Sequence, residues 1–126
     1  MNKDDFDYIS QLEGVERYEC FLDLVAEARE LWILVNENNE FLKVNADDTA
    51  QEVVPVWPHE DFAKAYAAAN SDGLIAMGIA LPQFFMKWVP GLEQDGLSVG
   101  VFPGPDADIW IMPPSELKAD LQDSFS

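Results

Sequence analysis

The residues of this sequence that could take part in a reaction include a single histidine, His59, in the stretch VVPVWPHEDF at residues 53–62. Histidine is the side chain best suited to general acid–base chemistry near neutral pH. A general base at this position would need a pocket, and aromatic side chains are available to wall it. The candidate pocket residues are Trp57, His59, Tyr66 and Trp110.

The same stretch also has a structural explanation. Pro58 suits the first turn of a helix, because its missing N–H would lack a partner there. Glu60 and Asp61 place negative charge at the positive end of the helix dipole. We therefore interpret His59 as a partly exposed residue at the start of a helix that makes one hydrogen bond, and the pocket remains the alternative.

The other reactive residue types do not combine into a catalytic or metal-binding set. Cys20 is the only cysteine and lies in an amphipathic helical pattern, which favours a core residue over a nucleophile. One histidine and one distant cysteine do not make a zinc site, and the sequence has no glycine-rich phosphate-binding motif. We predict no catalytic residue, no metal and no cofactor, in a protein that is not an enzyme.

The spacing of apolar residues predicts the elements that position these side chains. Apolar residues three or four positions apart indicate helices, and short apolar or alternating runs indicate strands. We expect helices at 15–29, 58–70, 82–92 and 113–122, and strands at 31–35, 41–44, 52–57, 74–81, 97–102 and 108–112.

The order of these elements predicts how they pair. The strands at 31–35 and 41–44 form a hairpin, and the strand–helix–strand order over 52–81 suggests a parallel crossover. Pro55 places its strand at a sheet edge or turns its own nitrogen outward. The fold class is α+β, with a single mixed β-sheet of about six strands and three to four helices packed mainly on one face.

Length and composition predict one domain over residues 1–126, because 126 residues of which 48% are hydrophobic can build one core. Residues 1–14 are polar and acidic, and we expect them to fray, with a helix over part of the segment as the alternative. No apolar run approaches the roughly 20 residues that span a bilayer, and the start MNKDDFDYIS lacks the apolar core of a secretion signal. With a single cysteine, these features predict a cytoplasmic protein.

Charge is the strongest compositional signal, with 24 acids against 7 bases and a formal net charge of −17. Such a surface lacks the basic contacts that bind phosphates, so we exclude nucleic acid and anionic membranes as partners. Most of the acids lie in the first half of the chain, which predicts an acidic docking face for a basic protein. The alternative is that these acids only keep the protein in solution. The candidate docking residues are Glu27, Glu30, Glu37, Glu40, Asp47 and Asp48.

Four stretches of the sequence resemble the bacterial domain of unknown function 2750 family. They are ERYECFL at 16–22, VVPVWPHEDFAKAY at 53–66, FMKWVPGLEQDGLSVGVFPGPD at 85–106 and PPSELKADL at 113–121. The resemblance covers most of the chain from about Val15, and implies a small α+β domain with no established activity. A looser similarity to SseB-like and SMI1/KNR4-type domains, where a PVF or PVW strand runs into a helix, suggests immunity proteins that bind toxins.

Two functions from different classes follow from these observations. We favour a non-enzymatic protein-binding module, either an adaptor or an immunity-type inhibitor of a basic partner. The alternative is a small-ligand binder or minor enzyme with a pocket near Trp57 and His59.

Overall fold

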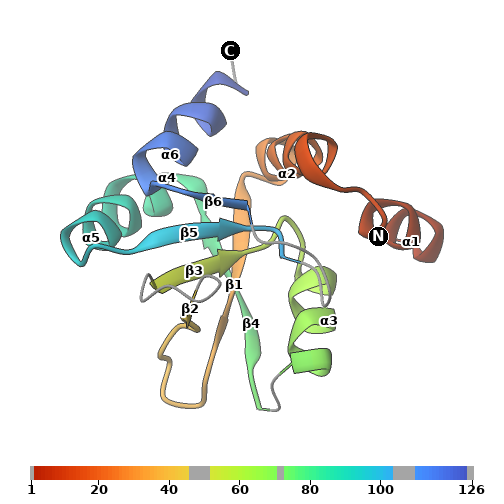
Figure 1. Ribbon diagram of the computed structural model, residues 1–126, viewed down its shortest axis with the longest axis horizontal. Coiled ribbons are helices and arrows are strands. Elements are labelled where there is room, and N and C mark those ends of the chain that lie inside the picture. The colour runs from red at the N-terminus through yellow and green to blue at the C-terminus, as the bar shows by residue number, and fades with distance from the viewer. Residues whose placement is uncertain (1, 46–51, 71–72, 104–109, 125–126) are drawn as a thin grey trace.

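The computed structural model describes residues 2–45, 52–70, 73–103 and 110–124, whose arrangement is shown in Figure 1. The helices are α1 (Lys3–Ser10), α2 (Gly14–Ala28), α3 (Glu60–Asn70), α4 (Leu81–Gln83), the π-helical turn η1 (Phe84–Trp88), α5 (Val89–Gln94) and α6 (Pro114–Asp123). The strands are β1 (Glu30–Val35), β2 (Val44–Asn45), β3 (Glu52–Val56), β4 (Ile75–Ala80), β5 (Ser98–Val101) and β6 (Trp110–Met112). The α+β class is confirmed.

The strands form two sheets, so the prediction of a single sheet is wrong. β1 and β4 pair antiparallel in a two-stranded sheet, and the second sheet has the order β2-β3-β5-β6. The two sheets meet at one bridge, where the backbone N–H of Trp32 and that of Trp57 each donate to the other residue's carbonyl over 2.8 Å. Among the described residues this is the pair that joins the sheets, and β1 and β3 diverge beyond it (Figure 1).

The predicted hairpin after β1 forms its turn and then separates. The N–H of Leu42 still donates to the carbonyl of Leu34 over 2.8 Å, but two residues later the chain pairs with β3 instead of β1. The returning segment therefore carries the chain from one sheet to the other. Apolar spacing alone predicts a hairpin here, because it does not show where a returning strand changes partner.

The predicted parallel crossover from β3 through α3 to β4 is also wrong. β4 pairs antiparallel with β1, and the parallel neighbour of β3 is β5, with Pro55 opposite Gly100. β3 lies inside its sheet and not at an edge. Trp57 directs its backbone groups toward Trp32, and residues two positions apart on a strand direct theirs to the same side. The nitrogen of Pro55 therefore faces the stretch of β3 between its pairs with β2 and the bridge to Trp32. No hydrogen bond of the described structure is lost there through its missing N–H.

The helices are divided between the two sheets and do not all cover one face. α2 and α3 contact β1, α3 also contacts β4, and α6 contacts β5. In Figure 1, α3 lies near β4 while α4, α5 and α6 lie at the other side of the molecule. With two sheets to cover, one helical layer is not sufficient.

The N-terminal residues, which we expected to fray, form α1. Asn2 caps this helix by accepting the N–H of Asp5 over 2.8 Å, and Ile9 is buried against the core. The ring of Phe6 stacks on Phe62 of α3 with ring centroids 4.8 Å apart. α1 is thereby attached to the start of α3, beside His59.

A π-helical turn interrupts the helical segment after β4, immediately before Pro90. The N–H of Val89 donates to the carbonyl of Phe84, five residues earlier. Pro90 has no N–H to donate and its ring would clash with the carbonyl four residues earlier, so a wider turn relieves the conflict. The turn leaves Trp88 half-buried on the side of Phe41.

Candidate functional site

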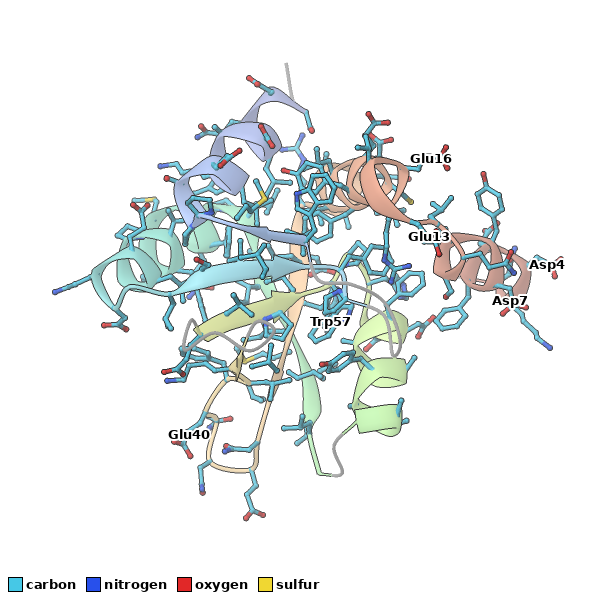
Figure 2. The ribbon with its side chains drawn as sticks, viewed as in Figure 1. Asp4, Asp7, Glu13, Glu16, Glu40 and Trp57 are labelled. Atoms are coloured by element: carbon cyan, nitrogen blue, oxygen red, sulfur yellow. The ribbon has the colours of Figure 1, made fainter. Side chains whose placement is uncertain are left out.

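Trp57, the central residue of the predicted pocket, lies in the core and not in a pocket wall. Its side chain is fully buried, its Nε1 donates to the carbonyl of Pro103 over 3.0 Å, and its ring lies against Tyr66 with centroids 5.1 Å apart. Burial raises the pKa of Tyr66. Figure 2 shows Trp57 in the interior of the molecule. This pair of rings fixes α3 against the sheets.

His59 begins α3 as its N-terminal cap. The His59 carbonyl accepts the N–H groups of Phe62 and Ala63, and its Nδ1 accepts the N–H of Asp61 over 3.1 Å. The same Nδ1 lies 3.6 Å from Asp61 Oδ2. The imidazole thus completes the start of the helix.

Trp110 lies apart from the other three predicted pocket residues, on β6. Its ring stacks on Tyr18 of α2 with centroids 5.1 Å apart, and 38% of the side chain is exposed. The hydroxyl of Tyr18 donates to Asp120 Oδ2 over 2.5 Å. Burial, this bond and the nearby carboxylates raise the pKa of Tyr18 above its usual 10.0. The pair joins α2, β6 and α6, and is a structural contact.

A hollow does adjoin His59, but with different walls from those predicted. Its volume is about 430 Å³, and it opens between α1, the end of α2 and the start of α3. Two carboxylates, Asp5 and Glu27, face it, and the rest of the lining is apolar apart from His59. We call this the acidic groove, lined by Asp5, Leu24, Glu27, Ala28, Pro58 and His59. Such a site suits a cationic group.

The predicted acidic docking residues do not share one surface. Glu27 and Glu30 lie where β1 begins, whereas Glu37 and Glu40 lie in the turn beyond its far end. A six-residue strand separates the two pairs by about 20 Å. Figure 2 shows Glu40 at a tip of the molecule remote from α2. The remaining two predicted residues, Asp47 and Asp48, fall outside the described residues.

A different acidic surface lies on the first two helices, and the sequence analysis did not single it out. Its acids are Asp4, Asp7, Glu13 and Glu16, all exposed, and Figure 2 shows them projecting outward at one end of the molecule. Tyr8 is 68% exposed and Val15 is 57% exposed in the same segment. We call these six residues the α1–α2 acidic surface.

Arg17, the only cation within α2, turns away from the exposed acids of that helix. It is only 8% exposed, and its Nε donates to the carbonyl of Phe102 over 2.8 Å. Its Nη1 donates to the carbonyls of Ser10 and Leu12 over 3.2 Å each, at the C-terminal end of α1. The guanidinium lies 3.8 Å from the centre of the Phe102 ring. Burial lowers the pKa of Arg17.

Cys20 lies one turn beyond Arg17 on α2 and is half-buried. Burial and the charge of Asp23 raise the pKa of the thiol, and Arg17 opposes this more weakly. A thiol with a raised pKa is a poor nucleophile at neutral pH. Cys20 therefore packs against the core, as the helical pattern indicates.

A second hollow, of about 290 Å³, lies beside the π-helical turn. Phe41 and Trp88 form an edge-to-face pair on its wall, with centroids 5.3 Å apart, and Lys87 and Asp95 lie at its rim. The sequence predicts a helix here but does not show that Phe41, which lies between β1 and β2, packs against it.

The described part of the chain contains neither a cluster of three metal-ligating side chains nor a helix long and apolar enough to cross a bilayer. Comparison with curated proteins found no match. The similarity to SseB-like and SMI1/KNR4-type domains stays a prediction. A family model, "Protein of unknown function (DUF2750)", matches residues 18–121, which include three of the four stretches that carry the resemblance and most of the other. The chain belongs to this family of proteins of unknown function.

Proposed function

We propose that this chain is a non-enzymatic protein-binding module that docks a basic partner on its α1–α2 acidic surface. The observation that carries the proposal is the inward orientation of Arg17. The only cation within α2 satisfies backbone carbonyls in the interior, so the acids of that helix keep their negative field. On α1 the one cation, Lys3, is outnumbered by Asp4, Asp5 and Asp7. The ion pairs of Lys43 with Glu52 and of Lys64 with Glu60 lie outside α1 and α2.

The composition of this surface supports a protein partner. Tyr8 and Val15 together offer apolar area, and exposed aromatic residues ringed by charge are typical of interface centres. Asp4 precedes Tyr8 by four residues on α1, so the two side chains share a helix face. The acids would speed the approach of a basic partner, and Tyr8 would contribute most of the contact energy.

The acidic groove extends the same surface toward α3. Asp5 and Glu27 are both exposed, and both line the hollow together with His59. A lysine or arginine side chain of the partner would place its charge between the carboxylates and its methylene stem against Leu24. This gives the groove a role in binding without requiring catalysis by His59.

The experiment that tests the proposal compares two charge-reversed variants of equal net charge. One carries Asp4→Lys, Asp7→Lys and Glu16→Lys, and the control carries Glu93→Lys, Asp95→Lys and Asp123→Lys, which are exposed acids elsewhere. The partner is first captured from the protein's own cell lysate, identified by mass spectrometry and purified. Its Kd is then measured for each variant at about 50 mM and about 300 mM NaCl.

We expect the first variant to weaken binding at least tenfold and the control to weaken it less than about threefold. Wild-type binding should weaken as salt increases, since the encounter is electrostatic. Equal effects of the two variants, or binding that does not respond to salt, would contradict the proposal.

The alternative function is a small-ligand binder or minor enzyme with a pocket near Trp57 and His59. Trp57 is buried in the core and cannot form a wall of such a pocket. The acidic groove beside His59 supports it only in another form, as a site for a small cation such as a polyamine. A thermal-shift titration with spermidine tests this form. A rise in Tm that Glu27→Gln abolishes and Glu93→Gln does not would support it, and a rise equal in both variants would exclude it.

A further inference from the structure

The hollow beside the π-helical turn has an aromatic wall. Phe41 and Trp88 meet edge to face there, each half-buried, and the buried side chain of Leu92 also lines the space. Its volume of about 290 Å³ lies just below the roughly 300–1,000 Å³ that is typical of small-molecule sites. The hollow therefore suits one aromatic ring with a short polar substituent.

Two residues of opposite charge line the same hollow. Lys87 and Asp95 are eight residues apart, about 12 Å along the helical segment, with Gly91 halfway between them. Residues four apart lie on one helix face, and the N–H of Asp95 donates to the carbonyl of Gly91 over 3.1 Å, as a regular turn requires. Neither charged side chain forms an ion pair with another described residue. The two ends of this row are therefore open to a ligand.

The charges around this hollow balance, although the chain as a whole has a formal charge of −17. Its lining contains one cation and one anion. Lys43 lies over the Phe41 ring, with Nζ 5.7 Å from its centre, and pairs with Glu52 over 3.9 Å, so it adds no net charge. A ligand with a single charge would pair with only one of the lining groups, whereas a zwitterion pairs with both.

Gly91 leaves open the space between the two charges. Glycine is unfavourable in a helix interior, and a positive φ or a close contact is the usual reason for its presence. Gly91 has no positive φ, and a Cβ built there would meet no described atom within 4 Å. Neither the backbone nor the packing of the described residues therefore requires glycine. Since Gly91 itself lines the hollow, a side chain at this position would occupy the hollow.

We propose that this hollow binds a free aromatic α-amino acid. The ring of the ligand would lie against Trp88 and Phe41. Its carboxylate and ammonium would lie over Gly91, where the carboxylate pairs with Lys87 and the ammonium with Asp95. Side chains on a helix tilt toward its N-terminus, so Asp95 leans toward Gly91, and the flexible stem of Lys87 lets its ammonium approach from the other end.

The two charges favour a free amino acid over an aromatic side chain of a protein partner. Within a protein chain the amino and carboxyl groups are part of peptide bonds, so such a side chain would fill the aromatic wall and leave Lys87 and Asp95 unpaired. An aromatic acid would pair with Lys87 alone, and an aromatic amine with Asp95 alone. The inference concerns a different surface from the α1–α2 acidic surface and does not rest on the proposed function.

The probes are L-tryptophan, tryptamine, which lacks the carboxylate, and indole-3-propionate, which lacks the ammonium. Each is titrated into the full isotope-labelled chain up to about 10 mM, and the NMR shifts of the Trp88 indole N–H and the Gly91 backbone N–H give its Kd. We expect L-tryptophan to bind at least about fivefold more tightly than either analogue, because only L-tryptophan pairs with both charges.

Lys87→Gln and Asp95→Asn test the assignment of the two ends. Lys87→Gln should weaken L-tryptophan binding to about the level of tryptamine, and should leave the Kd of tryptamine within about twofold of wild type. Asp95→Asn should weaken L-tryptophan binding to about the level of indole-3-propionate and leave the Kd of that analogue within about twofold. This crossed pattern distinguishes a zwitterion site from general attraction to a charged surface.

Gly91→Leu tests whether the space beside Gly91 is the ligand site. Leucine is favourable in a helix, so Tm should be unchanged or higher, whereas the new side chain should fill the hollow and raise the Kd of L-tryptophan at least about tenfold. Gln94→Leu is the matched control, because it adds the same side chain at an exposed position of α5 outside the described lining. It should leave the Kd within about twofold.

Three results would overturn the inference. One is the absence of any Trp88 shift with L-tryptophan at about 10 mM. Another is equal affinity for the three probes, which means that the ring binds without its charged groups. The third is L-tryptophan binding that Gly91→Leu does not change, which places the site elsewhere.

The captured protein partner separates this inference from the proposed function. If Gly91→Leu weakens that partner and L-tryptophan does not bind, an aromatic side chain of the partner occupies the hollow and the inference is wrong. The reversals of Asp4, Asp7 and Glu16 should weaken the partner and leave the Kd of L-tryptophan within about twofold. Either proposal can therefore fail while the other holds.

Discussion

Arg17 is the clearest example of how one residue determines both structure and surface. It binds carbonyls at the end of α1 and at Phe102 after β5, where helix and strand ends leave acceptors without intrahelical or ladder partners. Phe102 itself has a φ of 52°, an uncommon conformation for a residue with a side chain. Arg17 thus joins three segments through one planar group with several donors.

Replacing Arg17 with methionine should destabilise the chain by about 2–4 kcal/mol. Methionine keeps the apolar stem but leaves buried carbonyls, including that of Phe102, without a donor. Arg17→Lys should cost a smaller amount, because one ammonium reaches fewer of these acceptors. Urea unfolding measures both, with Lys64→Met as the control, since Lys64 is exposed and its ion pair contributes little. A cost below about 1 kcal/mol for Arg17→Met would show that water replaces the guanidinium.

Tyr18 gives a pH prediction with a definite sign. Its pKa is raised in the folded state, mainly by burial and then by the bond to Asp120, so the folded chain holds the phenolic proton more tightly than the unfolded chain. The stabilisation is complete below the unfolded pKa of 10.0 and is lost as pH rises above it. The loss has an upper limit of about 1.4 kcal/mol per pH unit, reduced by solvent screening at a half-buried ring.

The measurement is the free energy of unfolding from pH 8 to about pH 11 for wild type and Tyr18→Phe. We expect wild type to lose stability more steeply above pH 10, so that the difference between the two proteins narrows. Tyr8→Phe is the control, because Tyr8 is exposed and makes no comparable contact in the described structure. Parallel curves for wild type and Tyr18→Phe would contradict the role of Asp120.

At the scale of elements, the sequence predicts the long helices except α1 and the strands except β2, which it places at 41–44 instead of Val44–Asn45. It does not predict how the strands pair. Apolar alternation identifies β1, β3, β4 and β5, because period-two burial is a local property. Pairing depends on contacts between distant residues, such as Trp32 with Trp57, and no local pattern contains them. Pro55 correctly indicated a position without a backbone donor. Its strand is nevertheless internal to the sheet, and its nitrogen lies between the partners β2 and Trp32.

Gly78 shows how one such contact constrains β4. A Cβ at this position would lie 3.3 Å from the ring carbons of Trp32, its partner across the ladder. The small face of β4 therefore accommodates a tryptophan ring. The ring and the glycine should be energetically coupled.

We expect a double-mutant cycle to measure this coupling. Gly78→Ala should be less favourable in wild type than in the Trp32→Leu background by about 0.5–1 kcal/mol, because leucine leaves room for the new methyl group. In that background alanine should be neutral or stabilising, since glycine weakens a strand. Urea unfolding of the four proteins gives the cycle. A coupling energy near zero would mean that the Trp32 ring moves aside without cost.

At the scale of the whole molecule, composition predicts a negative surface but not its location. The predicted docking set assumed that acids close in sequence share a face, and β1 instead separates its members. The α1–α2 acidic surface depends on Arg17 turning inward, which residue counts do not show. Its acids also precede the residues matched by the family model, so the match carries no information about this surface.

The exposed acids of α2 should destabilise the free chain. Glu16, Glu19, Asp23 and Glu27 follow one another at spacings of three, four and four residues, and so form a stripe on one helix face. Each of the three neighbouring pairs costs about 0.2–0.5 kcal/mol, which sums to about 1 kcal/mol at low salt. A surface that weakens the helix bearing it is understandable if a basic partner relieves the repulsion.

This repulsion predicts opposite salt responses for folding and for binding. Raising NaCl from about 10 mM to about 150 mM shortens the screening length from about 30 Å to about 8 Å, and should raise the Tm of the free chain by about 3–5 °C. Glu19→Gln with Asp23→Asn removes all three pairs, so this variant should have a higher Tm at low salt and a smaller salt response. The control, Glu93→Gln with Asp123→Asn, changes net charge equally on α5 and α6. Calorimetry at both salt concentrations distinguishes the two. Equal increases in Tm for the two variants would assign the repulsion to net charge, whereas an increase confined to the α2 variant would assign it to the stripe. A basic partner that neutralises this stripe should then bind with an affinity that falls as salt rises.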